Sequence, residues 1–197
     1  DGTPLAQIIA SGSQADRDHA AQRYLEFLVA GPSAVGLLHS DPHPGNFRLT
    51  DDGRLGVIDF GAVCRLPHGL PEDIGTLITT AVLGDEDGLL AGLRHAGFVR
   101  DTVTLEASAL LAYLQPFLEP VRTPTFTFSR AWLRGIFAHI NDPRRPNFSV
   151  AMKINLPPEY LLIHRVWAGG VGVLSQIEGT VAGRDTINAY FPGAALP

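Results

Sequence analysis

Apolar residues recur at spacings of three and four along much of this 197-residue chain, a pattern typical of amphipathic helices. Near the N-terminus, this spacing places Ala20, Tyr24, Phe27 and Leu28 on one face of a predicted helix. Ser13, followed three positions later by Asp16, gives a capping pattern at the start of this helix. We predict that Gly31-Pro32 ends it, because glycine and proline are frequent just beyond helix ends.

From Pro71 onward, glycine and proline residues separate further amphipathic segments. Helices are predicted over roughly 71–83, 86–96, 102–118, 129–140, 158–178 and 184–190. The stretch from Tyr160 to Ile177 is the most apolar of the chain, yet it contains His164, Arg165 and several small or polar residues. We therefore interpret it as a buried helix and not as a membrane span.

Two short alternating runs, "FRLT" and "LGVI", flank the turn sequence "DDGR", which predicts a β-hairpin. With "DDGR" as a four-residue loop, the predicted cross-strand pairs are Thr50 with Leu55, Phe47 with Ile58, and Asn46 with Asp59. Directly opposed residues have Cβ atoms about 4.5–5.5 Å apart. The amide oxygen of Asn46 and the carboxylate of Asp59 would then share one hard cation such as Mg²⁺, which prefers oxygen ligands.

Asp41 lies five positions before Asn46, which is the D-x-x-x-x-N spacing of a kinase catalytic loop. In such a loop the aspartate orients or deprotonates the attacking hydroxyl group. Pro42 and Pro44 restrict the backbone between the two residues, so the loop is expected to be stiff. Asp59 opens a D-F-G sequence and is the expected principal Mg²⁺ ligand. The candidate site is thus Asp41 as the catalytic residue, with Asn46 and Asp59 as ligands of Mg²⁺ and ATP.

A D-F-G sequence alone has an ordinary use as a turn at a strand end. The ordered series of H-x-D, D-x-x-x-x-N, a hairpin of suitable length and D-F-G is much harder to obtain by chance. His39 is expected to be a hydrogen-bonding scaffold of the loop and not a catalyst. For His43 two alternatives stay open, namely bracing of the loop and contact with phosphate or substrate.

Net charge and cysteine content indicate which partners and which cellular location to expect. The net charge of −5 and the pI near 5.7 argue against a nucleic-acid partner, because such proteins usually carry a clustered basic face. Cys64 is the single cysteine and cannot form an internal disulfide, so a cytoplasmic location is expected. Lys153 is the only lysine, and this preference for arginine suggests a bacterial genome rich in G and C.

The stretch "LLHSDPHPGNFRLTDDGRLGVIDFGAVCRL" resembles the UbiB/AarF family of atypical protein-kinase-like proteins. The opening "DGTPL" and the late "LPPEYLLIHRVWAGGVGVLSQIEG" are also similar to segments of that family. The resemblance implies that Asp41 is the catalytic-loop aspartate and that Asn46 and Asp59 are metal ligands. It also implies an ATP-binding, kinase-like or ATPase-like protein tied to isoprenoid quinone biosynthesis or lipid homeostasis. Lipid or quinone precursors and peripheral membrane contact are the further partners it implies, since members are often membrane-associated.

The chain departs from kinase order, because no nucleotide-binding loop and no phosphate-binding lysine precede Asp41. It therefore resembles the C-terminal lobe of a longer protein, without the N-terminal lobe, and alone it is expected to be a poor nucleotide binder. Two alternatives stay open. One is a small-molecule phosphotransferase of the aminoglycoside or choline kinase type, which the apolar helical pattern after D-F-G disfavours. The other is a non-catalytic pseudokinase or lipid-binding scaffold, which the intact set of site residues disfavours.

The expected fold class is α+β and mainly α: a protein-kinase-like C-terminal lobe with a short catalytic β-hairpin and a helical cluster. Within residues 1–197 we expect a catalytic and metal-binding segment over 1–66 and a helical subdomain over 67–197.

Overall fold

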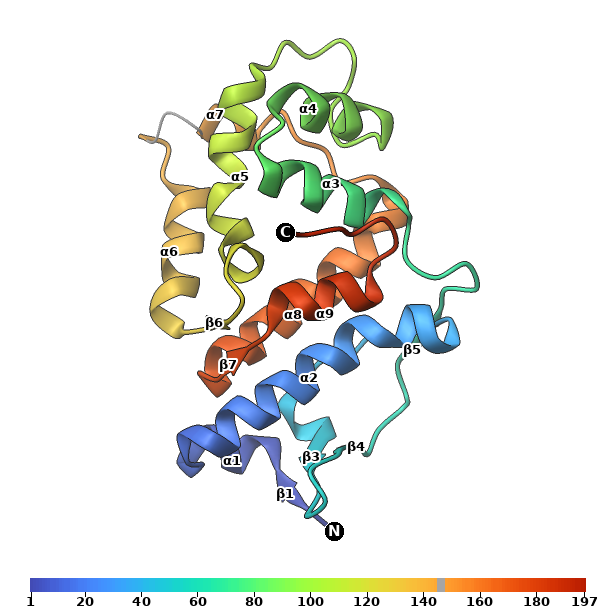
Figure 1. The fold of residues 1–197 in the computed structure, drawn as a ribbon, viewed down its shortest axis with the longest axis vertical. Helices are drawn as coiled ribbons and strands as arrows, with labels where there is room; N and C mark the ends of the chain where they lie inside the picture. The colour runs from blue at the N-terminus through green and yellow to red at the C-terminus, as the bar shows by residue number, and fades with distance from the viewer. Residues whose placement is uncertain (145–147) are drawn as a thin grey trace.

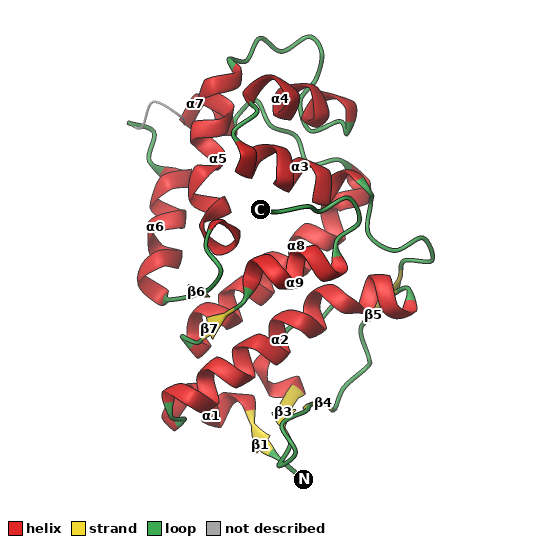
Figure 2. Cartoon of the chain, viewed as in Figure 1, coloured by secondary structure: helices red, strands yellow, loops and turns green. Residues whose placement is uncertain are grey.

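The computed structural model describes residues 1–144 and 148–197 and is mainly helical, with a few short strands (Figures 1 and 2). The helices are α1 Leu5–Ser11, α2 Gln14–Val35, α3 Asp73–Leu83, α4 Glu86–His95, α5 Ala107–Arg122, α6 Arg130–Asn141, α7 Phe148–Ala151, α8 Pro158–Ile177 and α9 Gly183–Tyr190. The strands are β1 Thr3–Pro4, β2 Leu37–His39, β3 Phe47–Leu49, β4 Leu55–Val57, β5 Val63–Arg65, β6 Phe126–Thr127 and β7 Thr180–Val181, with a 3₁₀ turn, η1, over Pro44–Asn46. The predicted mixed, mainly helical composition is confirmed.

Helix α2 begins as predicted and ends later than predicted. The Ser13 side chain accepts a hydrogen bond from the Asp16 N–H, and the Asp16 carboxylate accepts one from the Ser13 N–H, so the capping box is confirmed. The predicted end at Pro32 is wrong, because the helix continues to Val35. A proline in the last turn removes only one helical hydrogen bond. Gly36 ends the helix instead, with a left-handed φ of 65° and its N–H donating to the Pro32 carbonyl.

The later helices lie where the apolar pattern predicts them, with one shift. Helix α5 spans 107–122 instead of the predicted 102–118. Its start is later because Thr102, Val103 and Thr104 are β-branched and disfavour helix. Its end is later because Pro116 and Pro120 are both accommodated within the helix. Helix α8 contains eight buried residues and eight exposed ones, so the prediction of a buried helix is correct for one face of the helix only. None of the helices in the described part of the chain is long and apolar enough to span a membrane.

The strands in the described part of the chain form three small antiparallel sheets. Strand β3 lies between β1 and β4, β2 pairs with β5, and β6 pairs with β7. Each strand is two or three residues long, so the sheets shape the connections between helices and contribute little of the core.

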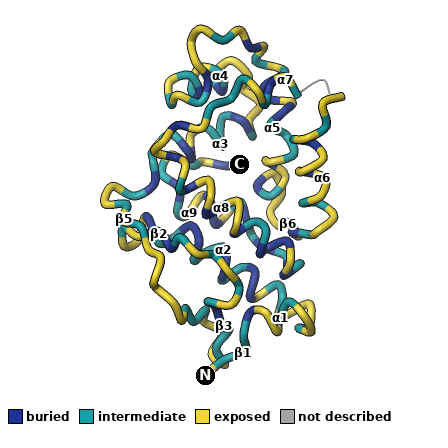
Figure 3. Tube along the Cα trace, turned by 180° about the vertical axis from the view of Figure 1, so that it is seen from behind, coloured by how far each residue is buried: buried dark blue, intermediate teal, exposed yellow. Residues whose placement is uncertain are grey.

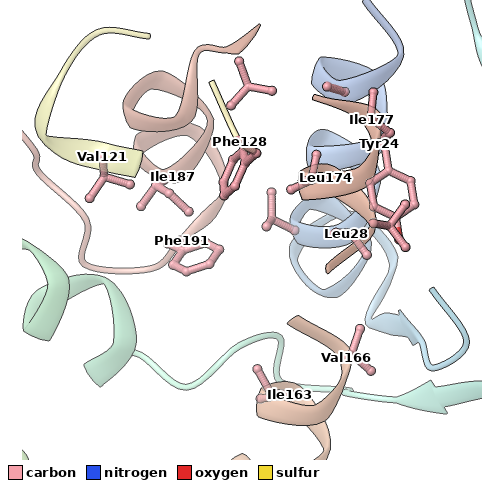
Figure 4. Packing of buried hydrophobic residues seen from close by; sticks show 14 of the residues in the cluster. Tyr24, Leu28, Val121, Phe128, Ile163, Val166, Leu174, Ile177, Ile187 and Phe191 are labelled. Atoms are coloured by element: carbon pink, nitrogen blue, oxygen red, sulfur yellow. The ribbon is translucent and has the colours of Figure 1, made fainter. Parts of the chain in front are cut away.

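Among residues 1–144 and 148–197, buried apolar side chains form two clusters. The main cluster joins α1, α2, α8 and α9, and Figure 4 shows Tyr24 and Leu28 of α2 next to Leu174 and Ile177 of α8. The second cluster lies among α3, α4, α5 and α7 at the top of Figure 1. Residues from both ends of the chain, Leu5 and Leu196, belong to the main cluster. The division of the chain at residue 66 stays a prediction.

Candidate functional site

The three predicted site residues come from the open end of one hairpin and the loop before it. Asp41 follows β2, Asn46 is the last residue of η1, and Asp59 lies two residues beyond β4. The segment from 58 to 62, between the hairpin and β5, is exposed and is part of the yellow trace that leads to β5 in Figure 3. Asp41 is also exposed, so the site lies at the surface beneath α2.

The hairpin is present, but its predicted register is wrong by one residue. The observed pairs are Phe47 with Val57, Arg48 with Gly56 and Leu49 with Leu55. The predicted pairs Thr50 with Leu55, Phe47 with Ile58 and Asn46 with Asp59 therefore do not form. Arg54 lies next to the first residue of β4 and pairs with Thr50, because the Thr50 N–H donates to the Arg54 carbonyl over 2.9 Å. Gly53, with a left-handed φ of 80°, closes the three-residue loop that remains.

As a consequence, Asn46 stands opposite Ile58 and not opposite Asp59. The Ile58 N–H donates to the Asn46 carbonyl over 3.0 Å, at the open end of the hairpin. Asp59 is the next residue along the chain. The hairpin thus brings Asn46 and Asp59 to the same end, offset by one position.

Asp41 and Asn46 are joined directly. The Asn46 Nδ2 donates to Asp41 Oδ2 over 2.8 Å and to the Asp41 carbonyl over 3.3 Å. Because a carboxylate only accepts hydrogen bonds, the amide nitrogen must face Asp41 and the Asn46 Oδ1 faces away from it. The D-x-x-x-x-N spacing therefore closes a loop whose two polar ends are in contact.

Asp59 is oriented by local contacts. Its Oδ1 accepts a hydrogen bond from the Gly61 N–H over 2.7 Å, which makes an Asx-type turn of the D-F-G sequence. Its backbone carbonyl accepts a hydrogen bond from Nε2 of His39 over 2.7 Å. His39 is buried, with 8% of its surface exposed, so the predicted scaffold role of this histidine is confirmed.

The turn between Asp41 and Asn46 is braced from within. Nδ1 of His43 accepts a hydrogen bond from the Gly45 N–H over 3.0 Å, and the His43 carbonyl accepts one from the Asn46 N–H over 3.0 Å. His43 thus braces the loop, which was one of the two alternatives. Contact of this histidine with phosphate stays a prediction.

Aromatic side chains from α2 support the loop, and sequence reasoning did not assign them to the site. Phe47 is fully buried and makes edge contacts with Tyr24 and Phe27, at centroid distances of 5.0 and 5.3 Å. His39 lies 5.6 Å from Phe27 and 6.0 Å from the exposed Phe60. The sequence signal for these residues was the predicted apolar helical face that contains Tyr24 and Phe27. The spacing of apolar residues shows that such a face is buried, but it does not show which loop the face covers.

The oxygen donors at this end of the hairpin are of the chemical type that Mg²⁺ prefers. Within the described residues, no group of three or more His, Cys, Asp or Glu side chains is arranged to hold a metal ion. The donors offered are instead Oδ1 of Asn46 and Oδ2 of Asp59, for which no hydrogen bond is found in the described part of the chain. Mg²⁺ is typically bound by one or two carboxylates together with phosphates and waters, so a carboxylate and an amide are a suitable donor set.

A D-x-x-x-x-N loop, a hairpin and a D-F-G turn, carried by a helical core, define this chain as kinase-like. Comparison with solved structures agrees: the Rv3197–erythromycin complex from Mycobacterium tuberculosis matches with a TM-score of 0.89 and 31% identity. That match covers 100% of this chain and 49% of the Rv3197 chain.

Residues 1–92 match the family model described as the ABC1 atypical kinase-like domain. ACTIVITY OF BC1 COMPLEX KINASE 1 of Arabidopsis thaliana is 34% identical over 84 residues, which is 39% of this chain and 12% of that protein. The uncharacterised protein sll0005 of Synechocystis is 26% identical over 183 residues, 78% of this chain and 26% of that protein. The resemblance to UbiB-type atypical kinases is confirmed, and the chain spans only part of the length of these relatives.

Proposed function

We propose that this chain forms the catalytic lobe of an ATPase or kinase of the ABC1 type, and that the full-length protein binds Mg-ATP. The single observation that carries the proposal is the contact between Asp41 and Asn46, at 2.8 Å, beside a hairpin end that also presents Asp59. Phosphoryl transfer is catalysed mostly by positioning and charge stabilisation, so a stiff polar loop of this kind suits it.

Each residue has a distinct proposed role. Asp41 orients the attacking hydroxyl group or water and accepts its proton. Asn46 and Asp59 hold Mg²⁺, which when bound neutralises charge on the ATP phosphates. Asn46 also restrains the Asp41 carboxylate through its amide nitrogen.

The biological setting is part of the proposal. We place the full-length protein in isoprenoid quinone biosynthesis or lipid homeostasis, in the cytoplasm with peripheral membrane contact, on the strength of the family resemblance. A lipid or quinone precursor is the proposed second partner, and nucleic acid is not one. The match to the ABC1 domain favours this assignment over a small-molecule phosphotransferase.

The test measures Mg²⁺-dependent ATP hydrolysis and nucleotide affinity in the full-length protein, in the 197-residue chain and in full-length Asp59→Asn. We expect turnover from the full-length protein, a decrease of about 100-fold in Asp59→Asn, and poor nucleotide binding by the 197-residue chain. Asp51→Asn is the matched control, because Asp51 is exposed in the hairpin turn at the opposite end from Asp59. Equal, weak turnover from all of these proteins would reject catalysis and favour a pseudokinase or scaffold.

A further inference from the structure

The loop that carries Asp41 has little support from strands. Strand β2 ends at His39 and β3 begins at Phe47, so the intervening residues are held by other contacts. Asp41 itself is exposed, and its side chain contacts Asn46. Pro42, the residue that follows Asp41, contacts both α2 and α8 and so links this loop to the helical core.

Helix α2 holds Pro42 from one side through Tyr24. The Tyr24 side chain is fully buried, and its hydroxyl group donates to the Pro42 carbonyl over 2.5 Å. The same ring makes a perpendicular edge contact with Phe47, at 5.0 Å and 89°. Tyr24 thus contacts the residue after Asp41 and the residue after Asn46, which are the two ends of the catalytic loop.

Helix α8 meets Pro42 through a glycine. A Cβ atom added at Gly169 would lie 2.9 Å from Cγ of Pro42, closer than non-bonded carbon atoms approach. Gly170 makes a similar close approach to Leu28 of α2. Gly172, on the same helix, has no neighbouring atom within 4 Å of an added Cβ. The absence of a side chain matters at Gly169, where α8 touches the loop, and not at Gly172.

From these contacts we infer that Tyr24 is a positioning residue for the catalytic loop, acting together with Gly169 through Pro42. The inference rests on the proposed function, because it assigns to Tyr24 the task of holding Asp41 and Asn46 where they act. The Tyr24 hydroxyl group suits this task. Burial, and to a smaller extent the charge of Asp41, raise its pKa well above the usual value, so the group keeps its proton and remains a donor.

The first test separates positioning from binding in the full-length protein. In Tyr24→Phe, which removes only the hydroxyl group, we expect kcat for ATP hydrolysis to fall by roughly 3- to 10-fold. In Gly169→Ala, which displaces the Pro42 ring, we expect a decrease of roughly 10- to 100-fold, as small misplacements of catalytic groups are costly. KM for Mg-ATP should change less than kcat in both variants, because Asp59, the principal proposed Mg²⁺ ligand, lies outside the displaced loop. Gly172→Ala, the matched control on α8, should keep the wild-type kcat.

A second readout does not depend on activity. In full-length protein labelled with ¹⁵N at asparagine, the side-chain amide of Asn46 reports its hydrogen bond to Asp41. We expect Tyr24→Phe and Gly169→Ala to shift this signal and Gly172→Ala to leave it in place. Wild-type kcat together with an unmoved Asn46 signal in Tyr24→Phe would overturn the inference, as would a rise in KM with kcat unchanged. If the wild-type protein shows no turnover, the proposed function fails, and the Asn46 signal alone then decides whether Tyr24 positions the loop.

Discussion

Two buried histidines, one in each half of the molecule, have nearly the same surroundings. His39 in β2 and His139 in α6 are 8% and 7% exposed. Each places Nε2 against a backbone carbonyl, that of Asp59 at 2.7 Å and that of Tyr113 at 2.9 Å. Each also packs against aromatic rings, Phe27 for His39 and Tyr113 for His139.

The two regions differ in what the histidine supports. His39 belongs to the catalytic-loop region, formed by α2, β2, η1 and β3, and its hydrogen bond restrains the D-F-G aspartate. His139 belongs to the α5–α6 region, where its hydrogen bond ties two helices together. A buried, hydrogen-bonded histidine is therefore not itself a mark of function. Its neighbours decide whether its loss affects chemistry or stability alone.

The largest expected effects come from a matched pair of core substitutions. Leu38 in β2 and Leu110 in α5 are 1% and 0% exposed, so Leu38→Ala and Leu110→Ala should each lower the free energy of unfolding by about 2–5 kcal/mol. Denaturant unfolding of the full-length protein measures this change. Leu38→Ala should also lower kcat per folded molecule, because Leu38 directly precedes His39 in β2. Leu110→Ala should leave kcat per folded molecule unchanged. An equal loss of kcat in the two variants would contradict the distinction between the regions.

The parts of the fold that sequence reasoning predicted are those set by local chemistry. Helix positions follow from apolar periodicity, and the capping box of Ser13 and Asp16 involves residues three positions apart. The order of Asp41, Asn46 and Asp59 identifies a kinase-like loop for the same reason, because all three lie within one short segment of the chain. The roles assigned to these three residues stay predictions.

The parts that sequence reasoning missed depend on backbone angles or on distant segments. The hairpin register turned on whether Arg54 is in the loop, which the left-handed angle of Gly53 decides. The hydrogen bond of Tyr24 is to the Pro42 carbonyl, which is 18 positions away along the chain. No periodicity reports such a contact, since it arises only when α2 packs over the loop.

A smaller effect is expected from replacing each histidine by phenylalanine. His39→Phe and His139→Phe keep a ring but remove the hydrogen bond to a backbone carbonyl, which should cost about 1–3 kcal/mol of unfolding free energy in each case. Only His39→Phe should also lower kcat, because the Asp59 backbone loses its restraint. Thermal unfolding and steady-state turnover of the full-length protein test both statements. A lower kcat in His139→Phe, at full folding, would show that α5–α6 contributes to the site.

The smallest effect concerns alkaline pH and compares Tyr24 with Tyr113. Burial raises the pKa of both phenols, and the charge of Asp41 raises that of Tyr24 further. A phenol whose pKa is higher in the folded protein stabilises the fold fully below the unfolded pKa, about 10, and this contribution is lost as the pH rises above it. For Tyr24 the loss approaches about 1.4 kcal/mol per pH unit.

Unfolding free energies measured between pH 9 and pH 11 should therefore fall less steeply in Tyr24→Phe than in the wild-type protein. Tyr113→Phe should have the same effect in smaller degree, because Tyr113 is less deeply buried than Tyr24 and no carboxylate contributes to its raised pKa. Asp41→Asn, which removes the charge beside Tyr24, should lower the pKa of Tyr24 and leave that of Tyr113 unchanged. An equal response of both tyrosines to Asp41→Asn would mean that the charge of Asp41 does not reach Tyr24 selectively, and the electrostatic difference between the two regions would then be lost.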